Sequence, residues 1–340
     1  MARNKQLPKH LLVLRTSAMG DVAMLPHALR ALLAAYPELK VTVATQAMFR
    51  PFFRGLEVDF LEVKTKDEHH SVCGMWRLAR EARRRGVDAV ADVHDVLRSK
   101  SFRLAMGLHG IRTAHIHKGR KAKHHALGTG GEFEPLKHSV VRYCDVIRRL
   151  GFVFDDPAPA VRPVCENPMG EKRGIWIGYA PFSAHAGKTY PEAQSRKLVE
   201  LLAARYERVF IHGGGGAELA FAEEMAAKYP KVTALFGKVR FAGEMELMAH
   251  EDCLISMDSM AMHMASLVAT PVVSVWGATH PKLGFLGWGS PMEHALQADM
   301  ACRPCSVFGA KPCKYGDYRC LQAVTPEMIV EKIEEILAKR

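Results

Sequence analysis

The chain has 340 residues, 48% of them hydrophobic, a size that supports two domains with separate buried cores. It carries 47 Lys and Arg against 36 Asp and Glu, and this net charge of +11 favours anionic partners such as nucleotide phosphates, anionic lipid headgroups or nucleic acid. No apolar run approaches the length that a membrane span needs, and the N-terminal residues lack the apolar core of a secretory signal. We therefore expect a cytoplasmic protein whose contact with a membrane is peripheral at most.

Short β-rich runs alternate with helical patterns in the first half of the chain. Residues 10–14, 41–44 and 87–92 favour strands, and residues 22–35 repeat apolar side chains at helical spacing. This alternation is typical of a parallel sheet with helices on its faces. Residues 75–85 predict a helix with one buried stripe and five arginines, whose basic face is either a solvated surface or a binding patch.

A proline-rich stretch, residues 155–172, is poor in helix and strand potential and predicts a linker between two domains. The alternation of strands and helices resumes after it. The sequence therefore predicts an α/β fold with two doubly wound, Rossmann-like domains that face an interdomain cleft. We expect an N-terminal domain at 1–165, a C-terminal domain at 170–325 and an amphipathic closing helix at 326–340.

The first candidate site is the turn R-T-S-A-M-G-D, residues 15–21, between a predicted strand and a predicted helix. Small residues and Gly20 let the backbone approach a ligand closely, and the N–H groups at the helix start attract an anion. Asp21 has two interpretations: it deprotonates a sugar hydroxyl, or it stabilises the helix dipole as a first-turn residue. The turn lacks the G-x-G-x-x-G pattern, which argues against dinucleotide binding.

The second candidate site is centred on Lys188, in the segment after the first predicted strand of the second domain. Lys188 precedes Pro191, which suits the first position of a helix, so its ammonium is placed to meet a diphosphate at that helix start. The triplet Gly187-Lys188-Thr189 resembles the end of a Walker loop, but Phe182 occupies the position of the required glycine.

Two further candidate sites follow strands of the predicted second domain. Four consecutive glycines at 213–216 precede a helix, and they indicate either close approach to a ligand or a turn without one. Asp258, Ser259 and His263 follow a strand at 252–257, and together they suit the binding of sugar hydroxyls and phosphate. The alternative is that Asp258 caps a helix and that His263 packs in the core.

These four motifs, in this order, resemble glycosyltransferase family 9, the lipopolysaccharide heptosyltransferases. The resemblance runs from the opening R-T-S-x-x-G-D-V to D-S-x-x-x-H-x-A-x-x-x-x-T-P-V-V-x-V-W-G at 258–277. It implies a GT-B fold whose N-terminal domain handles the acceptor and whose C-terminal domain handles an ADP-sugar donor. The implied enzyme is an inverting, metal-independent glycosyltransferase of lipopolysaccharide biosynthesis in the cell envelope, which moves a heptose or a related sugar from ADP-heptose to a lipopolysaccharide core or lipid A–Kdo acceptor.

The resemblance also implies roles for single residues. Asp21 takes the general-base position, Lys188 the donor-phosphate position, and Glu218 the position of an acid that contacts the nucleoside. The expected donor-binding residues are Ser183, Lys188, Gly216, Glu218, Asp258, Ser259, Met260 and His263, and the expected acceptor-binding residues are Ser17, Gly20, Arg120, Lys121 and Lys123. Met260 replaces a glycine that is common in the family, and this motivates an alternative, a catalytically degenerate protein of the same fold that binds nucleotide-sugar.

Two clusters lie outside these motifs. Cys302, Cys305, Cys313 and Cys320 begin with a C-x2-C spacing that is common at metal sites, so a structural zinc site and free thiols are alternatives. The stretch from His109 to His138 is rich in histidine, lysine and arginine. It predicts a flexible basic loop of the N-terminal domain, which is either solvated or grips an anionic glycolipid acceptor at the inner face of the inner membrane.

Two other protein classes fit less well. A nucleic-acid binder would suit the net charge, but the basic stretches lack interleaved aromatic residues and no nucleic-acid fold signature is present. An NAD-dependent oxidoreductase would suit the α/β pattern, but the dinucleotide fingerprint is missing. We therefore expect an ADP-sugar donor and an anionic glycolipid as partners, no nucleic acid, and no cofactor for catalysis.

Overall fold

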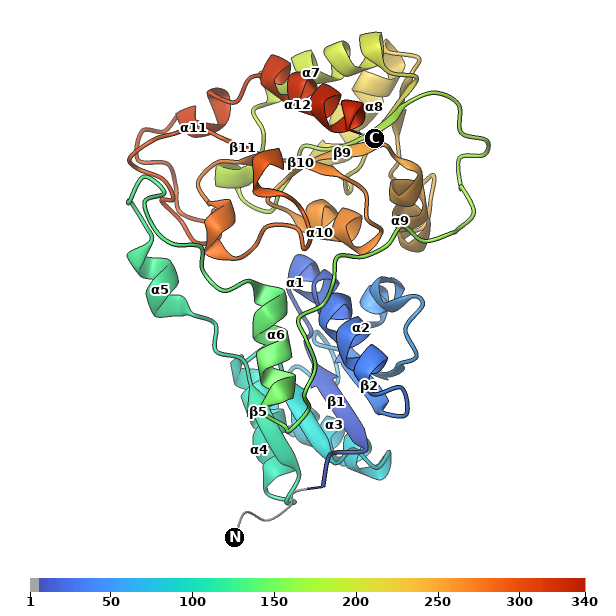
Figure 1. Cartoon of the computed structure of the whole chain (residues 1–340), viewed down its shortest axis with the longest axis vertical. Helices are drawn as coiled ribbons and strands as arrows, with labels where there is room; N and C mark the ends of the chain where they lie inside the picture. The colour runs from blue at the N-terminus through green and yellow to red at the C-terminus, as the bar shows by residue number, and fades with distance from the viewer. Residues whose placement is uncertain (1–5, 340) are drawn as a thin grey trace. The chain divides into compact units, whose positions relative to one another are not determined.

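The structure is a computed structural model that describes residues 6–339, which form two compact units (Figure 1). The first unit contains the residues up to Lys118 together with Ser139–Ala158, and the second contains Gly119–His138 together with the residues from Pro159 onwards. The segment Gly119–His138 therefore belongs with the second unit, although the sequence analysis assigns it to an N-terminal domain at 1–165. Residues 1–5 and 340, which the predicted domains include, lie outside the described residues.

The first unit is built on a five-stranded parallel sheet with the order β3-β2-β1-β4-β5. Its strands are β1 (His10–Leu14), β2 (Lys40–Thr45), β3 (Asp59–Glu62), β4 (Ala89–Asp92) and β5 (Arg112–His115). All residues of the central strand β1 are buried, which suits a parallel strand covered on both faces. Leu14 pairs with Ala44 and with Asp92, so β1, β2 and β4 end at one level and the segments that follow them meet there.

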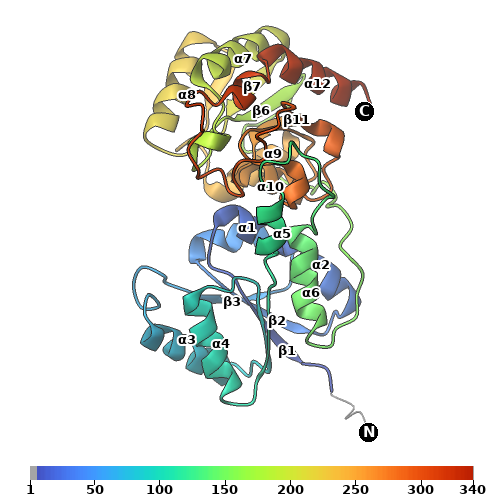
Figure 2. The same cartoon turned by 90° about the vertical axis from the view of Figure 1, so that its left-hand side faces the viewer.

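Helices cover this sheet. They are α1 (Met19–Ala23), α2 (Leu25–Ala35), α3 (Val72–Arg84), α4 (Leu97–Gly107) and α6 (Ser139–Arg148), with a 3-10 helix at Ala47–Phe53. Helices α3 and α4 lie side by side (Figure 2) and share one apolar core with the strands. Met75 and Leu78 on α3 and Phe102 and Met106 on α4 are buried in that core. Helix α3 begins where the hydroxyl of Ser71 accepts the N–H of Gly74.

The second unit has a six-stranded parallel sheet with the order β11-β10-β9-β6-β7-β8. Its strands are β6 (Trp176–Ala180), β7 (Arg208–Ile211), β8 (Val232–Ala234), β9 (Cys253–Met257), β10 (Val272–Trp276) and β11 (Ala295–Gln297). Ala180 pairs with Ser256 and Tyr179 with Ile211, so the ends of β6, β7 and β9 also lie at one level. Parallel sheets in both units confirm the predicted α/β class.

The helices of the second unit complete its layers. They are α5 (Arg120–His125), α7 (Glu192–Arg205), α8 (Ala217–Lys228), α9 (Phe241–His250), α10 (Met260–Leu267), α11 (Arg319–Gln322) and α12 (Pro326–Ala338), with 3-10 helices at Ala186–Lys188, Pro281–Leu283 and Met292–His294. Helix α12 begins at a cap in which the Thr325 hydroxyl accepts the N–H of Met328, and it packs against α7 through a buried stripe of isoleucines. Among residues 6–339 there is no helix with the length and apolar character needed to cross a bilayer.

Candidate functional site

Asp21 is held by a buried guanidinium at the carboxyl end of β1. The strand ends at Leu14, Arg15 follows it, and α1 carries Asp21 in its first turn. Nη2 of Arg15 lies 2.5 Å from Oδ2 of Asp21, and the two side chains are 7% and 30% exposed. The hydroxyl of Tyr143 donates a hydrogen bond of 3.1 Å to the carbonyl oxygen of Asp21. The carboxylate is therefore oriented by protein groups while part of its surface is open to solvent.

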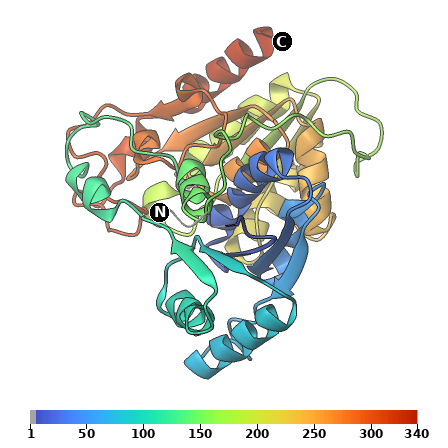
Figure 3. The same cartoon turned by 60° about the horizontal axis from the view of Figure 1, so that its bottom comes forward.

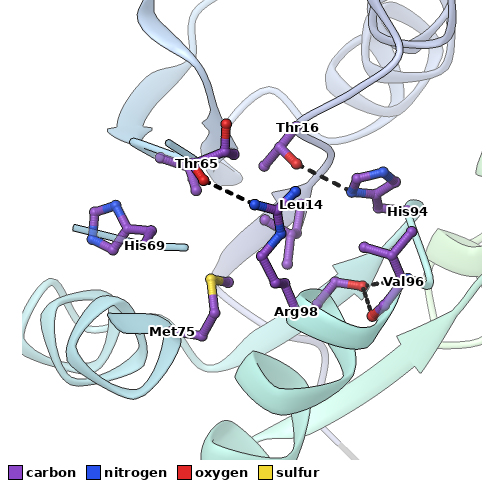
Figure 4. A pocket seen from close by; sticks show the side chains of 10 residues that line it. Leu14, Thr16, Thr65, His69, Met75, His94, Val96 and Arg98 are labelled. Carbon is purple, nitrogen blue, oxygen red and sulfur yellow. Dashed lines mark hydrogen bonds between the residues drawn. The ribbon is translucent and has the colours of Figure 1, made fainter. Parts of the chain in front are cut away.

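His94 contacts the two residues that follow Arg15. Its Nδ1 lies 3.2 Å from Oγ1 of Thr16, as Figure 4 shows, and its Nε2 lies 3.2 Å from Oγ of Ser17. Burial, and then the positive charges of Arg15 and Lys118, lower the pKa of His94 to about 3. The ring is therefore neutral at neutral pH, so one nitrogen donates a hydrogen bond and the other accepts one. The sequence analysis did not predict His94 as a site residue. The feature that could have marked it is its position two residues after strand β4.

A small pocket lies beside this histidine in the first unit. It is lined by Leu14, Thr16, Val63, Thr65, His69, Met75, His94, Val96, Arg98 and Ser99 (Figure 4). Nη1 of Arg98 donates a hydrogen bond of 2.9 Å to the carbonyl oxygen of Thr65, and Nε2 of Gln46 donates one of 2.6 Å to that of Thr16. The first bond joins helix α4 to the loop after β3, and the second joins the segment after β2 to the turn after β1. Sequence reasoning also missed Arg98, because its partner lies 33 residues away in the chain.

The structure divides the five predicted acceptor residues between the two units. Ser17 and Gly20 lie in the same turn as Asp21 in the first unit, whereas Arg120, Lys121 and Lys123 lie on α5 in the second. Arg120 and Lys121 are exposed.

Lys123 is buried rather than presented on a flexible loop. Its ammonium lies 3.9 Å from the centroid of the Phe285 ring, an arrangement in which the cation faces the aromatic π-system. Two backbone hydrogen bonds of 2.8 Å join the segment around Lys123 to the rest of the second unit. The N–H of Gly128 donates to the carbonyl oxygen of Pro304, and the N–H of Leu136 donates to that of Lys282. The segment is therefore docked by backbone hydrogen bonds, which differs from the predicted flexible loop.

Lys188 and Asp258 meet in the second unit. Lys188 ends the 3-10 helix that follows β6, and Asp258 is the first residue after β9. Nζ of Lys188 lies 3.3 Å from Oδ2 of Asp258, and the side chains are only 15% and 8% exposed. A Cβ on Gly309 would lie 2.5 Å from Cγ of Lys188, so glycine at that position leaves room for the lysine stem. The two residues that the sequence predicted from separate motifs thus form one buried ion pair.

The other predicted residues near this pair occupy the start of α10 and the loop after β6. Ser259 is the N-terminal cap of α10, and its hydroxyl lies 3.2 Å from that of Ser256. Met260 begins the helix and is partly exposed, whereas His263 is buried one turn later. The carbonyl of Ser183 accepts a hydrogen bond of 3.2 Å from the hydroxyl of Thr189. The loop that carries Lys188 is therefore closed by its own polar contacts.

The four-glycine loop is closed by Glu218. The N–H of Gly214 donates a hydrogen bond of 2.7 Å to Oε2 of Glu218 in the first turn of α8. Gly216 has φ +68°, a left-handed conformation that favours glycine, so the backbone by itself explains one of the four glycines. The second carboxylate oxygen of Glu218 remains available to a ligand hydroxyl, because a carboxylate accepts several hydrogen bonds.

A buried ion pair lies directly before the same loop. Nε2 of His212 lies 2.7 Å from Oε1 of Glu251, and the side chains are almost completely buried. Burial acts to lower the pKa of His212, but the charge and hydrogen bond of Glu251 outweigh it and the pKa is raised. Burial raises the pKa of the neighbouring Glu244 on α9. Sequence reasoning missed this pair, whose members are 39 residues apart.

The predicted zinc site is not supported. Within residues 6–339 there is no group of three or more His, Cys, Asp or Glu side chains placed to hold a metal ion. Cys320 packs in the apolar core of the second unit, and burial raises its pKa. Burial also raises the pKa of Cys305. The thiols of Cys305 and Cys320 are therefore protonated at neutral pH. None of Cys302, Cys305, Cys313 and Cys320 forms a disulfide within the described residues.

Comparison with known proteins identifies relatives of this chain. The sequence profile of glycosyltransferase family 9 (heptosyltransferase) matches residues 75–315. The chain is 36% identical to lipopolysaccharide heptosyltransferase 3 of Escherichia coli over 107 residues, which cover 31% of this chain and 32% of that protein. It is 31% identical to lipopolysaccharide heptosyltransferase 1 of Pseudomonas aeruginosa over 165 residues, 44% of each chain. The chain thus spans less than half of the length of these two relatives.

Solved structures resemble the whole chain. A glycosyl transferase of family 9 from Veillonella parvula has a TM-score of 0.75 at 18% identity and 98% coverage of both chains. The E. coli heptosyltransferase WaaC, solved with ADP-2-deoxy-2-fluoro heptose, has a TM-score of 0.67 at 18% identity, with 96% of this chain and 99% of that chain covered. At such identities the likeness shows the fold, which is the GT-B arrangement of two α/β domains.

Proposed function

Because the chain belongs to glycosyltransferase family 9, we propose that it is an inverting glycosyltransferase that moves a heptose, or a related sugar, from ADP-heptose to a lipopolysaccharide core or lipid A–Kdo acceptor. The observation that carries the proposal is the pair of Lys188, in the segment after β6, and Asp258, directly after β9; the two are 3.3 Å apart and largely buried. It supplies one cation for a diphosphate and one carboxylate for sugar hydroxyls. The WaaC structure with an ADP-heptose analogue supports the choice of donor.

In the proposed donor site, Lys188 stabilises the charge of the departing diphosphate. Its ammonium is already held near Asp258, so little side-chain reorganisation is needed when the diphosphate arrives. Ser259 and the N-terminal end of α10 add a hydroxyl and N–H groups, His263 is buried one turn further along the helix, and Glu218 contacts the nucleoside. Because Lys188 provides the positive charge, the proposed reaction runs without a metal ion or another cofactor.

In the proposed reaction, Asp21 is the general base. The acceptor hydroxyl gives its proton to the Asp21 carboxylate while its oxygen attacks the anomeric carbon, and the bond from that carbon to the β-phosphate oxygen breaks as ADP leaves. The orientation of Asp21 by Arg15, together with its partial exposure, supports this role. Inversion follows because the nucleophile and the leaving group lie on opposite faces of the carbon.

The acceptor residues are assigned by their surroundings. Ser17, held by His94, and the backbone at Gly20 lie beside Asp21 and would bind the acceptor sugar. Arg120 and Lys121 are exposed cations that would attract the phosphates of the glycolipid. We place the protein in the cytoplasm, at the inner face of the inner membrane where such a glycolipid is presented, and we assign it no nucleic-acid partner.

The alternative proposal is a degenerate protein that binds nucleotide-sugar without turnover. Met260 motivates it, because a bulky side chain begins the helix at the donor site. The two proposals make the same prediction for donor binding and opposite predictions for turnover.

The decisive experiment measures ADP release from ADP-heptose with and without a truncated Kdo-lipid A acceptor. Wild type is compared with Asp21→Ala and Lys188→Ala, and a thermal shift with ADP-heptose reports donor binding separately. Acceptor-dependent release that both variants lose supports the transferase and the two roles. Donor binding without release in the wild type contradicts the transferase with these substrates and favours the degenerate binder.

A further inference from the structure

The outer faces of α3 and α4 carry apolar side chains that the core does not use. On α4, Leu97 and Leu104 are 81% and 58% exposed, and Leu108, which follows the helix, is 66% exposed. Their spacing of seven and four residues places them along one face of the helix. On α3, Trp76 is 45% exposed. Single exposed leucines are ordinary, but three of them along one face of α4, together with an exposed tryptophan on the adjacent helix α3, make these two helices unusually apolar on the outside.

The same surface is strongly basic. Helix α3 carries Arg77, Arg80, Arg83 and Arg84 on its exposed side, and α4 adds Lys100. Glu81 is the acidic residue of α3, and it is paired at 2.5 Å with Arg85. In the part of the chain that the structure describes, Arg80, Arg83 and Arg84 have no carboxylate partner. The positive charge of this surface is therefore largely uncompensated.

The two helices present these side chains together. They lie side by side on the outside of the first unit, where Figure 3 shows them in cyan and teal. Their inner faces fill a shared core that includes Leu78 and Phe102, so the outer faces are fixed relative to each other.

We propose that the α3–α4 surface, formed by Trp76, Arg77, Arg80, Arg83, Arg84, Leu97, Lys100, Leu104 and Leu108, docks the protein on an anionic lipid bilayer. The leucines and Trp76 enter the region between headgroups and acyl chains, where apolar side chains leave water and tryptophan is favoured. The arginines pair with lipid phosphates while their aliphatic stems cover apolar surface. Nucleic acid would match the charge but would leave the three leucines in water. The choice of a bilayer rests on the proposed function, in which the acceptor is a membrane glycolipid.

The test is cosedimentation of the purified full chain with vesicles, which needs neither donor nor acceptor. Vesicles of phosphatidylcholine are compared with vesicles that also contain phosphatidylglycerol, at low and high salt. We expect binding to the anionic vesicles, weakened by salt, and a blue shift of Trp76 emission that the variant Trp76→Phe lacks. Trp176 and Trp276 are buried and serve as an internal reference.

Two variants separate the charge from the apolar row. Arg80→Glu/Arg83→Glu/Arg84→Glu and Leu97→Ser/Leu104→Ser/Leu108→Ser should each reduce partitioning at least tenfold. The matched control reverses three exposed lysines on α7, α8 and the residue before β8, as Lys197→Glu/Lys228→Glu/Lys231→Glu, and should retain most of the binding.

Three results overturn the proposal: no binding of wild type to anionic vesicles, equal loss in the control, or a dimer of the chain that the leucine variant dissolves. Circular dichroism confirms that each variant folds. Acceptor-dependent ADP release with acceptor dispersed in detergent tests the transferase independently, so a failure of membrane docking and a failure of the proposed function give different results.

Discussion

The carboxylate of Glu251 occupies the space that Gly178 leaves open on the face of the second sheet. A Cβ added at Gly178 would lie 2.1 Å from Oε2 of Glu251 and 2.6 Å from Cδ1 of Leu254. The absent side chain lets Glu251 reach His212 across strand β6. The glycine in the strand is thus explained by a buried ion pair rather than by backbone conformation.

Gly178→Ala should lower the free energy of unfolding by about 3 kcal/mol, because the buried carboxylate and Leu254 must both move to admit a methyl group. Gly107→Ala is the matched control, since no heavy atom lies within 4 Å of its added Cβ, and it should change stability by less than about 1 kcal/mol. Chemical denaturation of both variants measures the difference. Equal stability of the two variants would contradict the packing at Gly178.

The ion pair of His212 and Glu251 should make the stability of the second unit depend on pH. The pKa of His212 is raised above its ordinary value of 6.5, so its stabilising effect is fully present below pH 6.5 and is lost as pH rises through the raised pKa. Denaturation midpoints measured from pH 6 upwards should therefore fall. In Glu251→Gln the pH dependence should shrink, because the charge that holds the proton on His212 is gone. A wild-type midpoint that rises over this range is inconsistent with the charged pair.

The contribution of His94 to folding stability should change with pH in the opposite direction. Its pKa is lowered to about 3, so the unfolded chain binds a proton between about pH 6.5 and 3 that the folded chain does not, and stability should fall as pH falls through this range. The variant His94→Gln should remove this part of the loss of stability in acid. At neutral pH it should lower the free energy of unfolding by about 1–2 kcal/mol, because the contacts to Thr16 and Ser17 are lost. The exposed His109→Gln is the control, and it should behave as wild type.

Lys188→Ala should reduce kcat by about 100-fold or more, because a positive charge placed on the developing diphosphate acts mainly in the transition state. Lys188→Arg should recover part of the rate. Addition of a chelator should leave the wild-type rate unchanged in the proposed metal-free reaction. The exposed Lys197→Ala serves as the control. Steady-state ADP release with acceptor present measures all of these, and a rate abolished by the chelator would refute the metal-free mechanism.

Local patterns in the sequence predicted much of the fold and the donor motif. The alternation of β-rich and helical segments gave two parallel sheets because strand and helix periodicities are set by nearby residues. Asp21, Lys188 and Asp258 were recognisable because each follows a predicted strand, and strand ends of parallel sheets lie at one level. Their roles came from the resemblance to the family rather than from spacing.

Tertiary structure decided what depends on residues far apart in the chain. Ser17 meets His94 across 77 residues, and no local pattern marks that contact. Docking of Gly119–His138 on the second unit depends on backbone hydrogen bonds to residues more than 140 positions away, and it buries Lys123. The spacing of the cysteines suggested a metal site, but the structure buries Cys320 among apolar side chains in the core of the second unit. The sequence by itself determined the elements and the strand-end motifs, because these depend on local periodicity; the tertiary structure decided which side chains meet, because that depends on how distant segments pack.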